Sequence, residues 1–179
     1  MKGQVLLIID VQVGLFLGPP FPHETAAVLG RINALVDRAH AAGVPVIFIQ
    51  HDGTEEEGLT PESANWQIHP DVVRSMADLM IRKTASDAFF RSELGLQLAR
   101  LGASELIVTG YATEFCVDTT VRRAVSEGFD VILASDAHTT KDRSVLEAHE
   151  IIKHHNWVLS NLIQPEHSVR VMPVKGIEF

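Results

Sequence analysis

The chain of 179 residues is poor in cysteine, with a single thiol at Cys116. One thiol excludes an intramolecular disulfide and is typical of proteins in a reducing compartment, so we expect a cytoplasmic location. The apolar run Val5–Ile9 is interrupted at Asp10, and no small-residue cleavage site follows it. We therefore predict a buried strand at this position rather than a signal peptide.

Other absences narrow the class of protein. No apolar stretch approaches the ~20 residues that a membrane-spanning helix needs. The 15 Lys and Arg residues form no cluster and the net charge is −8, which disfavours nucleic acids and anionic membranes as partners. Neither G-x-G-x-x-G nor a P-loop follows the first apolar run, which disfavours a nucleotide-binding protein. We expect a small-molecule substrate as the partner.

Short apolar runs alternate with amphipathic stretches of helical spacing along the whole chain. This alternation is typical of βαβ units and predicts an α/β protein with a parallel sheet, in one domain spanning residues 1–179. The predicted strands are Val5–Ile9, Val46–Ile49, Leu79–Arg82, Leu106–Thr109, Val131–Leu133 and Val169–Met172, and the predicted helices are Glu24–Ala42, Glu93–Leu101, Thr113–Glu127 and Ser144–Asn156. The strands are almost entirely apolar, which indicates helices on both faces of the sheet.

The segment Asp52–Pro70 breaks this alternation. It contains three consecutive glutamates, two glycines, two prolines and Trp66, and its apolar residues follow no period. Long aperiodic loops in small domains are usually functional, so we predict a binding loop or lid.

Three reactive side chains lie at or just beyond predicted strand ends, where parallel sheets carry their sites. Taken singly, Asp10 could cap a turn, Lys83 could be solvated and Cys116 could be a small buried residue. Together they form an acid–base set. Asp10 could take the thiol proton, Lys83 could hold the carboxylate, and the first turn of a helix could favour a thiolate at Cys116.

The sequence around these residues has a more specific pattern. The blocks Asp10-Val-Gln12, Arg82-Lys-Thr-Ala-Ser-Asp-Ala-Phe-Phe90 and Gly110-Tyr-Ala-Thr-Glu-Phe-Cys-Val-Asp-Thr-Thr120 resemble, in order and spacing, the isochorismatase-like cysteine hydrolases. The resemblance implies a three-layer α/β/α fold whose six-stranded parallel sheet has the order 3-2-1-4-5-6.

The same resemblance implies roles for individual residues. Asp10, Lys83 and Cys116 would form a catalytic triad. The peptide bond between Tyr111 and Ala112 would be cis, and the backbone N–H groups of Ala112 and Cys116 would form an oxyanion hole. A dimer or tetramer of identical subunits is also expected, with His154–Leu162 as apolar surface.

The cysteine favours the amide-cleaving branch of this superfamily. We therefore predict a hydrolase that cleaves an amide, carbamoyl or lactam C–N bond of a small molecule through a thioester. Two alternatives remain. One is a vinyl-ether hydrolase of the isochorismatase type, with Asp10 as the acid and the thiol as a bystander, and the other is a non-catalytic binding protein on the same fold.

No cofactor is expected. Nicotinamidases of this superfamily bind a divalent ion through one Asp and two His just after the second strand, and the segment from Gln50 to Gly58 lacks that spacing. The alternative is a metal held by His51, Asp52 and His69, side chains that suit zinc. The departure from the motif also disfavours nicotinamide as the substrate.

Candidate substrate contacts are mostly aromatic, as suits a flat or apolar small molecule. They are Gln12, Phe16, Trp66, Phe90 and Tyr111. Trp66 is the most informative of them, because a tryptophan in a polar, aperiodic loop has few reasons to belong to a core.

Overall fold

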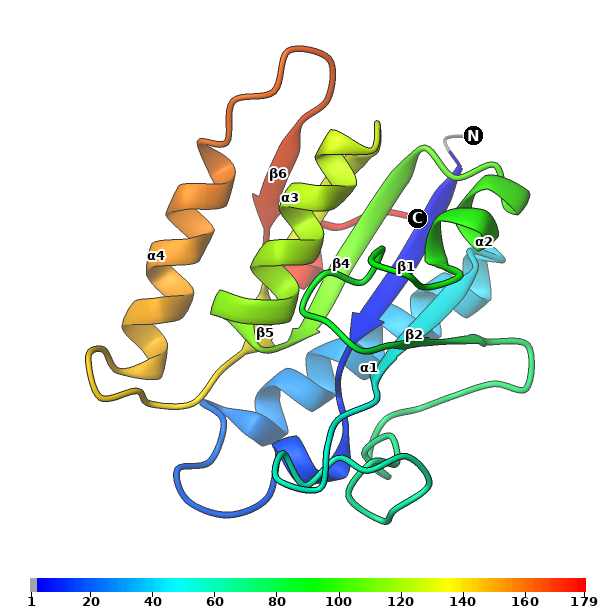
Figure 1. The fold of residues 1–179 in the computed structure, drawn as a ribbon. Coiled ribbons are helices and arrows are strands. Elements are labelled where there is room, and N and C mark those ends of the chain that lie inside the picture. The colour runs from blue at the N-terminus through cyan, green and yellow to red at the C-terminus, as the bar shows by residue number, and fades with distance from the viewer. Residues whose placement is uncertain (1–2) are drawn as a thin grey trace.

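A computed structural model describes residues 3–179, and its centre is a six-stranded sheet (Figure 1). All strand pairs are parallel and the strand order is β3-β2-β1-β4-β5-β6, which confirms the expected order. The strands are β1 (Gln4–Ile9), β2 (Val46–His51), β3 (Leu79–Lys83), β4 (Glu105–Tyr111), β5 (Asp130–Thr139) and β6 (Val169–Met172). The chain reverses its direction of winding between β1 and β4, which is where open α/β sheets bind their ligands.

Helices cover both faces of the sheet, because the central strands β1, β2 and β4 are apolar on both sides. In β1, Leu6 and Ile8 pack with α1 (Thr25–Ala42) on one face, and the alternate residues pack on the other. That second face is covered by α2 (Leu94–Arg100), α3 (Asp118–Ser126) and α4 (Ala148–Ser160). The expected α/β/α layering is therefore present.

Two predicted helices differ from the observed ones. The predicted helix Thr113–Glu127 is divided into a π-helical turn, Thr113–Val117, followed by α3. The predicted helix Ser144–Asn156 is shifted, since α4 begins at Ala148. A capping box between Glu147 and Glu150 fixes that start, and it leaves the preceding segment free to reach the carboxyl edge of the sheet.

The residues between β2 and β3 contain no helix or strand, as predicted for Asp52–Pro70. One isolated bridge, between Gln12 and Ile68, ties this loop to the segment after β1. Within residues 3–179, none of the helices combines the length and the apolar character that crossing a membrane requires.

Candidate active site

A cavity of about 510 Å³ opens at the carboxyl ends of β1, β2 and β4. Its floor carries Asp10 and Cys116, and its walls come from the loops that follow β1, β2 and β3 and from the segment before α4. The lining residues are Asp10, Leu15, His51, Glu57, Leu59, Thr84, Ala85, Ser86, Tyr111, Ala112, Phe115, Cys116 and Arg143.

The end of β1 holds Asp10 in an unusual backbone conformation. Its φ is +49°, in the left-handed region that only a few per cent of non-glycine residues adopt. Gly110 on β4 lies beside it with φ +125°, and a Cβ there would lie 2.1 Å from the carbonyl oxygen of Ile9. Only glycine lets the two central strands come this close, so Gly110 brings the end of β4 against the end of β1.

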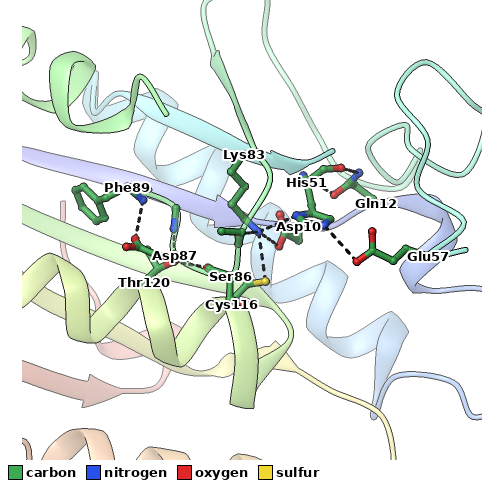
Figure 2. Close-up of polar contacts among 12 residues, drawn as sticks. Asp10, Gln12, His51, Glu57, Lys83, Ser86, Asp87, Phe89, Cys116 and Thr120 are labelled. Atoms are coloured by element: carbon green, nitrogen blue, oxygen red, sulfur yellow. Dashed lines mark hydrogen bonds and ion pairs between the residues drawn. The ribbon is translucent and has the colours of Figure 1, made fainter. Parts of the chain in front are cut away.

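Lys83 reaches this point from β3, the edge strand. Neighbouring strands lie about 4.8 Å apart, so only a long side chain can cross from β3 to β1. Its ammonium donates to three acceptors, Asp10 Oδ2 at 2.7 Å, Ala85 O at 3.0 Å and Cys116 Sγ at 3.3 Å (Figure 2). The three N–H groups of this buried cation are thus all used, which offsets the cost of its burial.

Cys116 lies in the π-helical turn that follows a cis peptide bond between Tyr111 and Ala112. The Ala112 carbonyl accepts hydrogen bonds from the N–H groups of Phe115 and Val117, which closes the turn. Such π turns are rare and often occur at functional sites. Both residues of the expected oxyanion hole, Ala112 and Cys116, line the cavity.

The surroundings of Cys116 favour the thiol over the thiolate that its place near a helix start led us to expect. Burial and the neighbouring Asp10 carboxylate raise its pKa to about 12, and Lys83 opposes them only in part. Asp10 Oδ1 is buried and has no hydrogen-bond partner among residues 3–179. An unpaired carboxylate oxygen beside a protonated thiol is positioned to accept its proton.

A buried chain of polar groups supports the π turn from behind. Asn156 on α4 donates to the carbonyl of Ser135, so its amide oxygen faces His138 Nε2 at 2.9 Å. Nε2 must therefore carry the hydrogen, and Nδ1 accepts from the Thr113 hydroxyl at 2.8 Å. Burial lowers the pKa of His138 to about 4, so the ring is neutral near neutral pH. The sequence carried no pattern that ties these three side chains together.

One wall of the cavity is aromatic and carries a paired charge. Arg143 Nε lies 2.7 Å from Glu114 Oε1, and its guanidinium lies over the ring of Phe115, 5.3 Å from the centroid. Tyr111 lines the same region, and burial raises its pKa. Sequence reasoning did not single out Phe115 or Arg143, although Phe115 directly precedes the cysteine.

The other predicted substrate contacts lie outside the cavity lining. Gln12 is fully buried and binds the backbone of His51 and Trp66, so it anchors the loop. Phe16 packs behind Tyr111 at 5.6 Å. Phe90 is half exposed beside Arg91, because the chain has turned away from the cavity by that residue.

Trp66 also serves the loop rather than the cavity. Its Nε1 donates to Asp52 Oδ1 at 2.9 Å, and the guanidinium of Arg82 lies over its ring at 5.2 Å. Trp66 therefore has structural partners in Asp52 and Arg82, which the composition of the loop did not reveal. Of the five predicted contacts, the structure brings Tyr111 alone to the cavity lining.

The alternative metal site does not fit the geometry. His51 faces the cavity, but Asp52 is bound by Arg82 and Trp66, and His69 packs against Phe16. In the described part of the chain, no group of three or more His, Cys, Asp or Glu side chains is arranged to hold a metal ion. His51, Asp52 and His69 therefore do not converge as ligands, and cofactor independence stays a prediction.

Known proteins share this sequence and fold. The isochorismatase domain family matches residues 4–160. A streptothricin hydrolase of Streptomyces noursei is 37% identical over 139 residues, which cover 78% of this chain and 50% of that protein. Nicotinamidase 3 of Arabidopsis thaliana is 28% identical over 161 residues, which cover 82% of this chain and 78% of that protein.

Solved structures of isochorismatases are also similar to this chain. An isochorismatase of Pseudomonas putida KT2440 superposes with a TM-score of 0.89 at 28% identity, covering 99% of this chain and 92% of that one. An isochorismatase family protein superposes with a TM-score of 0.86 at 31% identity, covering 94% and 98%. The chain spans about half the length of the two streptothricin hydrolases that it matches, at 50% and 55%. It belongs to the isochorismatase family.

Proposed function

We propose that the protein is a hydrolase that cleaves an amide, carbamoyl or lactam C–N bond of a small molecule through Cys116. The observation that carries this proposal is the contact of a buried ammonium, Lys83, with both Asp10 Oδ2 and Cys116 Sγ in one cavity. The relatives named streptothricin hydrolase, nicotinamidase and ureidoacrylate amidohydrolase support a hydrolase of this kind.

In the first half of the reaction, Asp10 takes the proton from the Cys116 thiol as the sulfur attacks the substrate carbonyl carbon. The π electrons of the carbonyl move to its oxygen, and the N–H groups of Ala112 and Cys116 bind this oxyanion. The protonated Asp10 then gives its proton to the nitrogen. The C–N bond breaks, the amine leaves, and a thioester remains on Cys116.

In the second half, Asp10 takes a proton from water, and the resulting hydroxide equivalent attacks the thioester carbonyl. The C–S bond breaks, the carboxylic acid leaves and the sulfur regains a proton from Asp10. Lys83 stays cationic throughout, because Asp10 and Cys116 raise its pKa against the effect of burial. Its role is to orient the carboxylate and to stabilise the sulfur anion while it forms.

A panel of small amides, lactams and carbamoyl amines tests the proposal. The protein should release ammonia or amine from at least one of them. Intact-mass measurement should detect an acyl adduct on Cys116, and Cys116→Ala should remove both signals. Release with no adduct in the wild type, or release that survives Cys116→Ala, would contradict a thiol mechanism.

The two alternatives give different results in the same experiment. A vinyl-ether hydrolase that uses Asp10 as the acid would keep its turnover in Cys116→Ala and lose it in Asp10→Asn. A non-catalytic binding protein would release nothing from any compound. The homodimer or homotetramer and the cytoplasmic location stay predictions, and the exposed Trp157 on α4 supports an apolar contact between subunits.

A further inference from the structure

A carboxylate faces the triad from the loop after β2. Glu57 lines the same cavity as Asp10 and Cys116, and Figure 2 shows its side chain directed toward His51, which lies between it and the triad. The proposed reaction has no use for this carboxylate. Its position at the cavity therefore needs a separate explanation.

The loop holds this side chain in a fixed position. The Thr54 N–H donates to Glu57 Oε2 at 2.6 Å, and the Glu57 N–H donates to the Thr54 hydroxyl at 3.2 Å. At Gly53 a Cβ would lie 2.9 Å from Oε2, so a larger residue would push the carboxylate away. These contacts occupy Oε2 and leave Oε1 directed toward His51.

The other charges around the cavity are paired. Lys83 neutralises Asp10 at 2.7 Å, and Arg143 neutralises Glu114 at 2.7 Å. The hydrogen bond from the Thr54 backbone lowers the pKa of Glu57, so Glu57 carries a full negative charge near neutral pH. Among the described lining residues, this charge is the one without a cation beside it.

His51 does not supply that cation. Burial and the nearby Lys83 lower its pKa, so the ring is neutral near neutral pH. The Lys83 ammonium lies 3.5 Å from His51 Nδ1, and its positive charge favours the tautomer with the lone pair at Nδ1 and the N–H at Nε2. Nε2 lies 4.0 Å from Glu57 Oε1, which is too long for a hydrogen bond.

We propose that Glu57 selects substrates that carry a cationic group, an ammonium or a guanidinium, on the side remote from the bond that is cleaved. The inference deepens the proposed function by naming a substrate class. The Glu57 side chain is 54% exposed, so the cation would bind Oε1 through a charge-assisted hydrogen bond at the solvent-facing wall of the cavity. A neutral substrate would leave this carboxylate to water.

The single thiol allows a test that needs no known substrate. Three methanethiosulfonates of similar size, bearing a primary ammonium, a hydroxyl or a sulfonate group, each form a disulfide with Cys116 and release methanesulfinate. We compare their rates, relative to the neutral reagent, for the wild type, Glu57→Gln and Glu56→Gln. Glu56 is exposed on the same loop and does not line the cavity, so its variant controls for net charge.

In the wild type the cationic reagent should react faster than the neutral one, and the anionic reagent more slowly. Glu57→Gln should reduce the cation-to-neutral rate ratio by about fivefold to tenfold, whereas Glu56→Gln should change it less than about twofold. An equal ratio in the wild type and Glu57→Gln overturns the proposal, and so does an equal loss in both variants.

This result is separate from that of the amide panel. A charge-dependent ratio without any amide turnover would retain the cation site and reject the hydrolase. Amide turnover with a ratio that does not depend on Glu57 would retain the hydrolase and reject cation selection. Once a substrate is known, Glu57→Gln should lower kcat/KM for a cationic amide about tenfold more than for its neutral isostere.

Discussion

The cavity has two sides that are built in different ways. Its floor, formed by Asp10, Lys83 and Cys116, lies at the ends of strands and in the π turn, where Asp10 and Lys83 are 1% and 2% exposed. Its loop wall, formed by residues 53–59, is held by turns of the backbone and lies largely at the surface. The sheet therefore fixes the reactive groups, and the loop can change without disturbing them. This division suggests that the floor sets the chemistry and the loop wall sets the substrate.

The largest effect should follow from changing the base of the floor. Asp10→Asn should reduce amide turnover about 10²–10⁴-fold, because the thiol loses its proton acceptor. The same change removes the negative charge that raises the pKa of Cys116 and leaves Lys83, which lowers it. The pKa should fall, so the alkylation rate of Cys116 by iodoacetamide at about pH 8 should rise at least about tenfold.

Asp52→Asn is the matched control for this change, since Asp52 is a carboxylate bound by Arg82 and Trp66 beside the loop wall. It should leave both the turnover and the alkylation rate within about threefold of the wild type. If alkylation and turnover fell together in Asp10→Asn, the assignment of Asp10 as the group that raises the thiol pKa would be wrong.

The free energy of unfolding should also distinguish the floor of the cavity from its surroundings. Lys83→Met leaves the Asp10 carboxylate buried without its cation, so the free energy of unfolding should fall by about 3–5 kcal/mol. The double variant Asp10→Asn, Lys83→Met should recover most of this loss but no activity. Urea unfolding followed by circular dichroism measures both.

Arg82, the neighbour of Lys83 on β3, provides the comparison for this loss of stability. Arg82→Met removes an ion pair with Asp52 in which the arginine side chain is half exposed, so it should cost at most about 1 kcal/mol. A loss in Arg82→Met as large as that in Lys83→Met would show that the buried ion pair of the floor and the exposed ion pair beside the loop wall do not differ in how strongly they hold the fold.

His138, which supports the π turn, should make the free energy of unfolding depend on pH. The fold lowers the pKa of His138 from an ordinary value of 6.5 to about 4. Between these two pH values the unfolded chain therefore binds a proton at His138 that the folded chain does not bind. The free energy of unfolding should therefore fall as the pH drops from about 6.5 to about 4, by about 3 kcal/mol in all.

His138→Gln should remove that part of the pH dependence, and the exposed His154→Gln should keep it. Urea unfolding at several pH values measures the difference. An unchanged pH slope in His138→Gln would show that other groups dominate the pH dependence.

Thr113→Val should lower kcat more than it raises KM, because the hydroxyl acts on the turn that carries Cys116 and not on the substrate.

The floor could be predicted from the sequence and the walls could not, for a physical reason. Asp10, Lys83 and Cys116 lie at or just beyond the ends of strands, and the parallel strands of one sheet bring their ends to one edge, so these positions along the chain indicate their meeting point. Glu57 is placed by turn contacts with Thr54, and Arg143 by a helix that begins four residues later than its apolar spacing predicts. No periodic pattern records such contacts.

Phe16, Trp66 and Phe90, three of the four aromatic candidates, lie outside the cavity lining for a related reason. A tryptophan in a polar loop can bury its ring against an arginine and its N–H against a carboxylate, as Trp66 does. Composition indicates that such a residue has a partner, but the partner can be either a substrate or the loop itself. Only the path of the chain decides which of these it is.

The smallest effect should come from that tryptophan. Trp66→Phe removes the hydrogen bond to Asp52 and keeps most of the ring, so the free energy of unfolding should fall by about 1 kcal/mol. The alkylation rate of Cys116 should stay within about twofold, because the floor rests on the strands. Trp157→Phe is the control, since Trp157 is 67% exposed on α4 and should cost less. A tenfold change in alkylation in Trp66→Phe would show that the loop after β2 and the floor are coupled, and the two would have to be treated as one unit.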